Sequence, residues 1–192
     1  MSIKDKVFDL PILFDVVRWC VLGSYKPMFS NLTKFVDHKD DETVLEIGCG
    51  TGIFSKLFKK NYTGVDFFDE FIVKAKREFP DKKFAVMDAM NMDFKDKSYD
   101  KVLLLNFLHH MDDDEFEKVM HECKRIAKKG VFIMEPVPQK YNLVGRVLYS
   151  LARGKHIRDF FLLKDMLNNY SKVKRYHMFR SLFYKLVLIE CV

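Results

Sequence analysis

Val44 to Gly52 reads VLEIGCGTG, and this stretch decides the fold that the sequence predicts. A short apolar run leads into a loop with glycine at every second position: Gly48, Gly50 and Gly52. The apolar residues behind the loop recur at helical spacing: Ile53, Phe54, Leu57 and Phe58. Strand, glycine loop and helix open a nucleotide-binding α/β sheet, because glycine permits positive φ and lets a ligand approach main-chain N–H groups.

The loop spacing separates two classes of nucleotide-binding sheet. A dinucleotide fold has the pattern G-x-G-x-x-G, whereas this loop has E-x-G-x-G-x-G, with Glu46 inside the strand end. A fixed carboxylate repels a pyrophosphate but tolerates a ligand with an amino group and a cationic centre. The spacing therefore disfavours a nicotinamide oxidoreductase.

Composition excludes several other classes of protein. A chain of 192 residues with 48% hydrophobic residues fits one folded domain. Its four cysteines form no CxxC pair, which argues against a metal site and a disulfide framework and favours a reducing cytosol. Three charged residues and a proline interrupt the apolar stretch from Val7 to Leu22, so we expect no signal peptide, no transmembrane segment and a cytoplasmic protein.

Polar residues follow the ends of the apolar runs. The run Tyr62 to Asp66 ends in an acid that lies 18 positions after Gly48. This is close to the offset of about 20 residues at which an acid reaches a ribose diol. Phe67 follows directly and is placed to lie against an adenine face. The other runs are 84–87, followed by Asp88 and Ala89; 101–106, which ends at Asn106; and 131–134.

Helical patterns alternate with these runs. One helix is expected from an N-cap at Asp69, and a second from the acids after Met111 to a stop at Gly130. The alternation predicts an α/β fold with a doubly wound parallel sheet that binds ligands at the carboxyl ends of its strands. The polar candidates all lie at such ends: Glu46, Asp66, Asp88 and Asn106.

The E-x-G-x-G-x-G pattern resembles the first motif of the class I S-adenosylmethionine-dependent methyltransferases. The motif matches at Glu46, Gly48, Gly50 and Gly52. The resemblance, to the small-molecule type and the ubiquinone and menaquinone biosynthesis group, covers roughly residues 42–135, and the final hairpin by architecture only. The resemblance implies S-adenosylmethionine as the cofactor and a seven-stranded, mostly parallel Rossmann-like sheet with an antiparallel last strand and helices on both faces.

The resemblance also implies roles for single residues. Glu46, Gly48 and Gly50 would hold the methionine portion of the cofactor, with Cys49 as the small residue of that cofactor-binding turn. Asp88 and Ala89 would meet the adenine, and Asn106 would line the pocket. The implied single domain, 1–192, has four parts: a helical cap (1–40), a cofactor-binding core (42–135), a helical insertion acting as substrate lid (139–171) and a terminal hairpin (172–192).

His109 and His110 follow the fourth strand and are the candidate catalytic residues. An imidazole suits a general base, which methyl transfer needs only when the nucleophile carries a proton. The alternative is that one histidine caps the next helix or bounds the pocket. The Asn-Pro-Pro-Tyr motif of enzymes that methylate base amino groups is absent, which disfavours a nucleic-acid enzyme.

The region from Lys140 to Arg180 contains ten Lys and Arg and two acids. It fits an anionic substrate or a lipid headgroup at a peripheral membrane contact, an RNA, or a solvated face. Candidate substrate residues are Tyr25, Tyr141 and Arg153. We expect a methyltransferase, monomeric or weakly dimeric, acting on a small anionic or lipid-like molecule; the alternatives are an RNA methyltransferase and a non-catalytic cofactor-binding protein.

Overall fold

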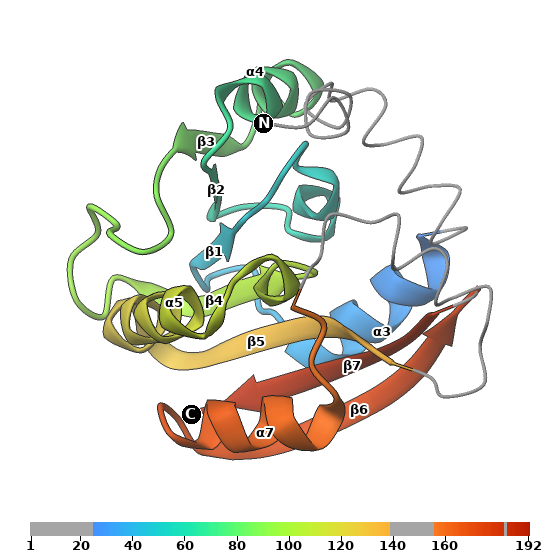
Figure 1. Cartoon of the computed structure of the whole chain (residues 1–192). Coiled ribbons are helices and arrows are strands. Elements are labelled where there is room, and N and C mark those ends of the chain that lie inside the picture. Colours follow the sequence, from blue (N-terminus) through green and yellow to red (C-terminus); the bar gives the residue numbers. More distant parts are fainter. Residues whose placement is uncertain (1–24, 139–155, 183) are drawn as a thin grey trace, which may run out of the picture.

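A computed structural model describes residues 25–138, 156–182 and 184–192 (Figure 1). Residues 1–24 of the predicted helical cap, 1–40, lie outside them. The described elements, in chain order, are α3 (Lys26–Val36), β1 (Val44–Ile47), η1 (Ile53–Leu57), β2 (Tyr62–Asp66), α4 (Asp69–Glu78), β3 (Lys83–Val86), β4 (Tyr99–Leu105), η2 (Leu108–His110), α5 (Asp113–Ile126), β5 (Ala127–Val137), α7 (Phe160–Asn168), β6 (Val173–Ser181) and β7 (Tyr184–Cys191).

The strands form one seven-stranded sheet in the order β3-β2-β1-β4-β5-β7-β6. Strands β1 to β5 pair in parallel, and β7 runs antiparallel to both of its neighbours. The winding reverses between β1 and β4, and the crevice outside the carboxyl ends at such a point is where ligands bind in open α/β sheets. The predicted mostly parallel Rossmann-like sheet with an antiparallel last strand is confirmed.

Helices cover both faces of this sheet, because β4 is apolar on both of its faces. Val102 and Leu104 belong to one core, and Leu103 and Leu105 belong to the other. Successive side chains of a strand point to opposite faces, so a continuous apolar run requires a helical layer on each side. Helices α5 and α7 pack on the first face, and α3, η1 and α4 pack on the second (Figure 1).

Two predictions of helix geometry are wrong in detail. The helix expected behind the glycine loop is the 3-10 helix η1, and Phe58 after it is already extended, with φ −117° and ψ 113°. The chain enters β2 at Tyr62, which leaves too few residues for further turns of helix. Asp69 is the first residue of α4, whose N-cap is Phe68.

Gly130 does not end a helix, which corrects another prediction. Helix α5 ends at Ile126, and β5 begins at once, with Gly130 paired to Lys101 of β4. A Cβ at Gly130 would lie 3.0 Å from the carbonyl oxygen of Cys191. The close approach of β7 therefore accounts for this glycine.

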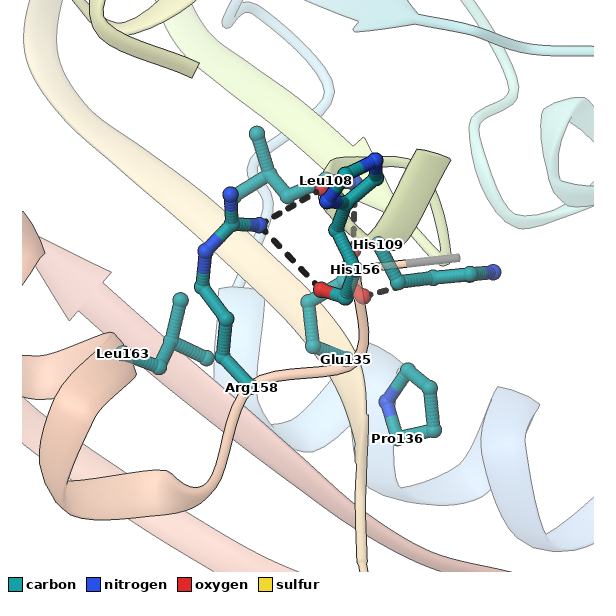
Figure 2. A pocket seen from close by; sticks show the side chains of 7 residues that line it. All are labelled: Leu108, His109, Glu135, Pro136, His156, Arg158 and Leu163. Atoms are coloured by element: carbon teal, nitrogen blue, oxygen red, sulfur yellow. Dashed lines mark hydrogen bonds and ion pairs between the residues drawn. The ribbon is translucent and has the colours of Figure 1, made fainter. Parts of the chain in front are cut away.

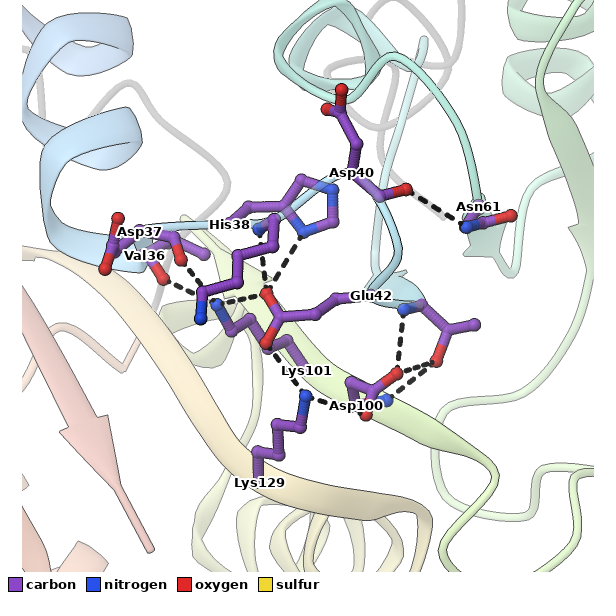
Figure 3. A network of polar contacts seen from close by, with 11 residues as sticks. Val36, Asp37, His38, Asp40, Glu42, Asn61, Asp100, Lys101 and Lys129 are labelled. Atoms are coloured by element: carbon purple, nitrogen blue, oxygen red, sulfur yellow. Dashed lines mark hydrogen bonds and ion pairs between the residues drawn. The ribbon is translucent and has the colours of Figure 1, made fainter.

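A polar network joins α3, β1, β4 and β5 near the amino ends of β1 and β4 (Figure 3). The ammonium of Lys101 donates to the carbonyls of Val36 and Asp37 at 2.9 Å each and lies 2.7 Å from Glu42 Oε2. Lys129 Nζ lies 3.0 Å from Glu42 Oε1. Burial opposes ionisation, but hydrogen bonds from Lys101, Lys39 and Lys129 hold the pKa of Glu42 at about 2.

No helix within the described ranges is long and apolar enough to cross a membrane. The same part of the chain contains no group of three or more His, Cys, Asp or Glu placed to hold a metal ion. The cytoplasmic location, the peripheral membrane contact, the oligomeric state and the boundaries of the four parts of the domain stay predictions.

Candidate active site

The carboxyl ends of five neighbouring strands carry the polar residues of the candidate site. In sheet order these are Asp88 after β3, Asp66 on β2, Glu46 on β1, Asn106 after β4 and Glu135 on β5. Because parallel strands end at one edge of the sheet, the edge gathers residues far apart in the sequence. Sequence reasoning missed Glu135, although its position at the end of the fifth strand is the same signal that identified Asp66.

The glycine loop adopts a conformation that favours glycine at all three positions. The φ angles of Gly48, Gly50 and Gly52 are 68°, 54° and 76°. A Cβ at Gly48 would lie 2.1 Å from Cδ2 of Phe107, and Cys49 between the first two glycines is buried. The loop therefore has room for backbone and a ligand but not for an added side chain at Gly48.

Asp66 ties the second strand to this loop. One carboxylate oxygen accepts the N–H of Gly50 at 2.8 Å, and the other accepts the N–H of Phe68 at 3.0 Å. Burial raises the pKa of Asp66, and the backbone donors of Phe68, Gly50 and Phe67 partly offset this rise. A carboxylate has about four lone-pair sites, so Asp66 can still accept from a ligand hydroxyl.

Glu46 lies buried in β1 beneath the loop. Its Oε2 accepts the hydroxyl hydrogen of Tyr62, on β2, at 2.6 Å. Burial, together with the charge of Glu46, raises the pKa of Tyr62 well above its usual range, so the phenol remains a donor. The predicted methionine-binding carboxylate is thus oriented by the neighbouring strand.

The residues predicted around an adenine differ in exposure. Phe67 is 66% exposed beside Asp66, so its ring is available to a ligand. Asp88 is half-buried and accepts the N–H of Met90 at 2.9 Å through Oδ1. Its Oδ2 has no hydrogen bond within the described ranges and can accept an exocyclic amine. Ala89, the small neighbour, packs against the first core.

Asn106 is the clearest indication that this edge is built for a ligand. Its Nδ2 is buried and has no hydrogen-bond partner in the described part of the chain. Its φ is 56°, a left-handed conformation that costs a non-glycine residue energy. A buried amide without a partner costs about 1–3 kcal/mol, which a ligand acceptor would recover. The edge therefore fits a cofactor with hydroxyl, amino and carboxylate groups.

His109 is held by the missed residue Glu135 (Figure 2). Glu135 is buried, and its Oε2 lies 2.7 Å from Nδ1 of His109. Its Oε1 accepts the N–H groups of Phe107 and Leu108 at 2.8 and 2.7 Å. His110 is exposed, with its ring centroid 4.2 Å from that of His109. The two predicted catalytic histidines therefore differ: His109 is hydrogen-bonded to a buried carboxylate, and His110 is exposed.

The segment before α7, which lies within the predicted insertion, docks on the same turn. The N–H of His156 donates to the carbonyl of His109 at 3.1 Å. Arg158 is buried and donates to the carbonyls of Leu108 and Met111 at 3.1 and 3.0 Å, with Asp113 Oδ1 at 2.6 Å. The side chains that line the resulting pocket are Leu108, His109, Glu135, Pro136, His156, Arg158 and Leu163 (Figure 2).

The predicted substrate residues are only partly described. Tyr25 stacks on Phe29 and meets the edge of Phe54 in η1, at centroid distances of 5.8 and 6.5 Å. It therefore packs on the second core beside η1. Tyr141 and Arg153 lie outside the described residues. Their predicted roles stay predictions.

Several known proteins that this chain resembles are methyltransferases. Residues 45–134 match a family model described as a methyltransferase domain. The chain is 32% identical to a phosphatidylethanolamine N-methyltransferase of Cereibacter sphaeroides over 57% of this chain and 58% of the relative. It is 30% identical to a demethylmenaquinone methyltransferase of Thermotoga maritima over 57% of this chain and 50% of that relative. The chain thus spans about half the length of the curated relatives it matches.

A solved structure extends the likeness to most of the fold. The magnesium protoporphyrin IX methyltransferase of Synechocystis, determined with bound S-adenosylhomocysteine, superposes with a TM-score of 0.68 at 17% identity. The match covers 88% of this chain and 83% of the other. At this level of identity the likeness shows a shared fold.

Proposed function

We propose that this chain, which carries a class I S-adenosylmethionine-dependent methyltransferase domain, methylates a small lipid-like molecule. The predicted family and cofactor are confirmed by the methyltransferase domain over residues 45–134. The single observation that carries the proposal is the row of polar residues at the carboxyl ends of the strands around the glycine loop. Four neighbouring strands place Asp88, Asp66, Glu46 and Asn106 along it.

Each residue of this edge has a binding task that suits its chemistry. Asp66 accepts the two ribose hydroxyls, Asp88 accepts the adenine amine beside Phe67, and Glu46 lies under the loop that receives the methionine portion. The cofactor supplies an electrophilic methyl group on a sulfonium. The protein fixes the approach of the acceptor, and orientation of this kind contributes about 7–11 kcal/mol to a displacement.

The lipid-like acceptor rests on the lining of the pocket and on the relatives. Leu108, Pro136 and Leu163 give the pocket beside His109 an apolar wall. Two relatives are named for phosphatidylethanolamine and demethylmenaquinone, both molecules with long hydrocarbon chains. The pocket is too small for a whole lipid, so it would receive only the reacting end of such a molecule.

Calorimetric titration of S-adenosylhomocysteine tests the cofactor site. We expect micromolar binding to the wild type, loss of at least tenfold in affinity in Asp66→Ala, and no binding of NAD. Asp81→Ala is the matched control, because Asp81 is exposed and pairs only with the neighbouring Lys82. Thermal melting of each variant separates lost binding from lost folding. Preference for NAD, or equal affinity in Asp66→Ala, would contradict the proposal.

Transfer of a radiolabelled methyl group tests the acceptor. The probes are vesicles of phosphatidylethanolamine, a prenylated hydroquinone and a tRNA transcript. Labelling of either lipid supports the proposal. Labelling of the tRNA alone would favour an RNA methyltransferase, and cofactor binding without transfer to any of the three would favour a non-catalytic cofactor-binding protein.

A further inference from the structure

We propose that Glu135 is a positioning residue that holds His109 as the general base for an acceptor whose reacting oxygen or nitrogen carries a proton. The inference rests on the proposed function and adds the class of acceptor atom: a hydroxyl or an amine. The geometry around Glu135 carries it (Figure 2).

Glu135 is placed to fix both the backbone and the side chain of the turn after β4. Its side chain is 3% exposed, and its Oε1 accepts the N–H groups of Phe107 and Leu108. The remaining oxygen, Oε2, lies 2.7 Å from His109 Nδ1. One buried carboxylate therefore sets where the turn lies and how the imidazole is rotated within it.

The same contact decides which nitrogen of His109 can take a proton. An ionised carboxylate only accepts hydrogen bonds, so Nδ1 must carry the hydrogen. The neutral ring then has its lone pair on Nε2, which has no hydrogen-bond partner among the described residues. A ring nitrogen oriented by a buried carboxylate, with its opposite nitrogen unprotonated, is the arrangement that a general base needs.

His109 rather than His110 has this arrangement. His110 is exposed, whereas the side chain of His109 is 13% exposed and hydrogen-bonded to the buried Glu135. The charged and titratable groups around His109 are Glu135 from β5, His110 beside it, and His156 and Arg158 from the segment before α7. Arg158 points its charge to Asp113 and to backbone carbonyls.

These groups account for every bond, electron pair and proton in the methyl transfer. The acceptor oxygen or nitrogen forms a bond to the methyl carbon, the bond between that carbon and the cofactor sulfur breaks, and its electron pair goes to sulfur. The proton of the acceptor goes to His109 Nε2, and the imidazolium is stabilised by Glu135. An acceptor whose reacting atom carries no proton does not need His109 and Glu135 as a base.

Glu135→Gln is the decisive variant, because glutamine can keep the backbone contacts and reverse the tautomer. Its amide oxygen can accept from Phe107 and Leu108, while its NH2 donates to Nδ1 and leaves the hydrogen on Nε2. We expect kcat to fall by about 10²–10⁴-fold, as for His109→Ala, with no further loss in the double variant. The affinity for S-adenosylhomocysteine and the melting temperature should stay near wild type. His121→Ala, at an exposed histidine of α5, is the control and should retain most of the activity.

Two readouts separate failure of this inference from failure of the proposed function. Nitrogen-15 NMR of the histidines reports the tautomer without any acceptor: we expect hydrogen on Nδ1 of His109 in the wild type and on Nε2 in Glu135→Gln. Hydrogen on Nε2 in the wild type would overturn the inference even if methyl transfer occurs. Product analysis with the hydroquinone and phosphatidylethanolamine probes gives the second readout. Methylation at carbon, or activity that survives in both His109→Ala and Glu135→Gln, would also overturn it.

Discussion

The guanidinium of Arg158 donates to the carbonyl oxygen of Leu108 at 3.1 Å, across 50 positions of sequence. It thereby joins the segment before α7 to the turn that carries His109. The guanidinium also lies over the ring of Phe116, 4.9 Å from its centroid, at the start of α5. One buried side chain thus connects three elements next to the candidate active site.

Replacement of Arg158 tests this connection. Arg158→Ala removes the guanidinium that donates to the Met111 carbonyl and one of the two donors to the Leu108 carbonyl, so we expect a loss of about 2–4 kcal/mol in the free energy of unfolding. Arg158→Lys should restore little, because an ammonium cannot reproduce the planar fork. Urea denaturation measures the loss, and amide exchange should rise at residues 108–113. Arg180→Ala, at an exposed arginine of β6, should change stability by less than about 0.5 kcal/mol.

The clash at Gly48 predicts the effect of a methyl group in the glycine loop. Gly48→Ala forces an L side chain to φ 68° and places its Cβ 2.1 Å from Phe107. We expect a loss of about 1–3 kcal/mol in stability and loss of S-adenosylhomocysteine binding. Adding Phe107→Ala removes the clash but not the unfavourable φ, so the double variant should recover part of the stability. A fully stable, cofactor-binding Gly48→Ala would show that the loop has another conformation.

Asn106 permits a test that separates its side chain from its backbone. Asn106→Gly retains a φ of 56° without strain and removes the buried amide. We expect affinity for S-adenosylhomocysteine to fall about tenfold, the value of one hydrogen bond, while the melting temperature is retained. Asn61→Gly is the matched control, because Asn61 has φ 55° but lies before β2, away from the glycine loop. Equal affinity in wild type and Asn106→Gly would show that the amide of Asn106 does not contact the cofactor.

The network at the amino ends of the strands predicts a pH dependence of stability. The pKa of Glu42 is about 2 in the folded protein, against an ordinary value of 4.5. The folded state therefore gains stability from the ionised group above pH 4.5, and this gain is lost as the pH falls toward 2. The difference corresponds to about 3 kcal/mol.

Glu42→Gln tests this assignment by urea denaturation at pH 7 and pH 3. The variant should be less stable at pH 7, because Lys101 loses its buried partner, and its stability should fall less between the two pH values. Asp40→Asn is the control, since the Asp40 carboxylate is exposed and, among the described residues, pairs with Lys59 at 3.9 Å. If the stability of wild type and Glu42→Gln depended equally on pH, other carboxylates would be responsible for the acid sensitivity.

The sequence predicted the elements whose signals are local. Strand β2 has the predicted bounds, Tyr62 to Asp66, because its apolar run is closed by the acid at its end. The acids after Met111 begin α5 as expected: Asp112 accepts from the N–H of Glu115 at 2.9 Å, and Glu115 accepts from the N–H of Asp112 at 3.0 Å. Each of these signals lies within a few residues of the structure that it determines.

Two of the predictions that failed depended on parts of the chain that are distant in sequence. The length of η1 is limited by where β2 must begin, and Gly130 is required by the carbonyl of Cys191 on β7. Helical spacing does not indicate where β2 must begin, and a lone glycine does not indicate that β7 will pack against it. Both errors arose where the sheet overrode a local pattern.

The sequence by itself determined the glycine loop, the alternation of strands and helices, and the acids at the strand ends, because backbone conformation and hydrophobic period are properties of neighbouring residues. Only the tertiary structure decided which histidine is oriented. Glu135 reaches His109 because β5 pairs in parallel with β4 in a register that brings their carboxyl ends together. A buried carboxylate needs donors to offset its desolvation, and folding brought them from the turn after the adjacent strand.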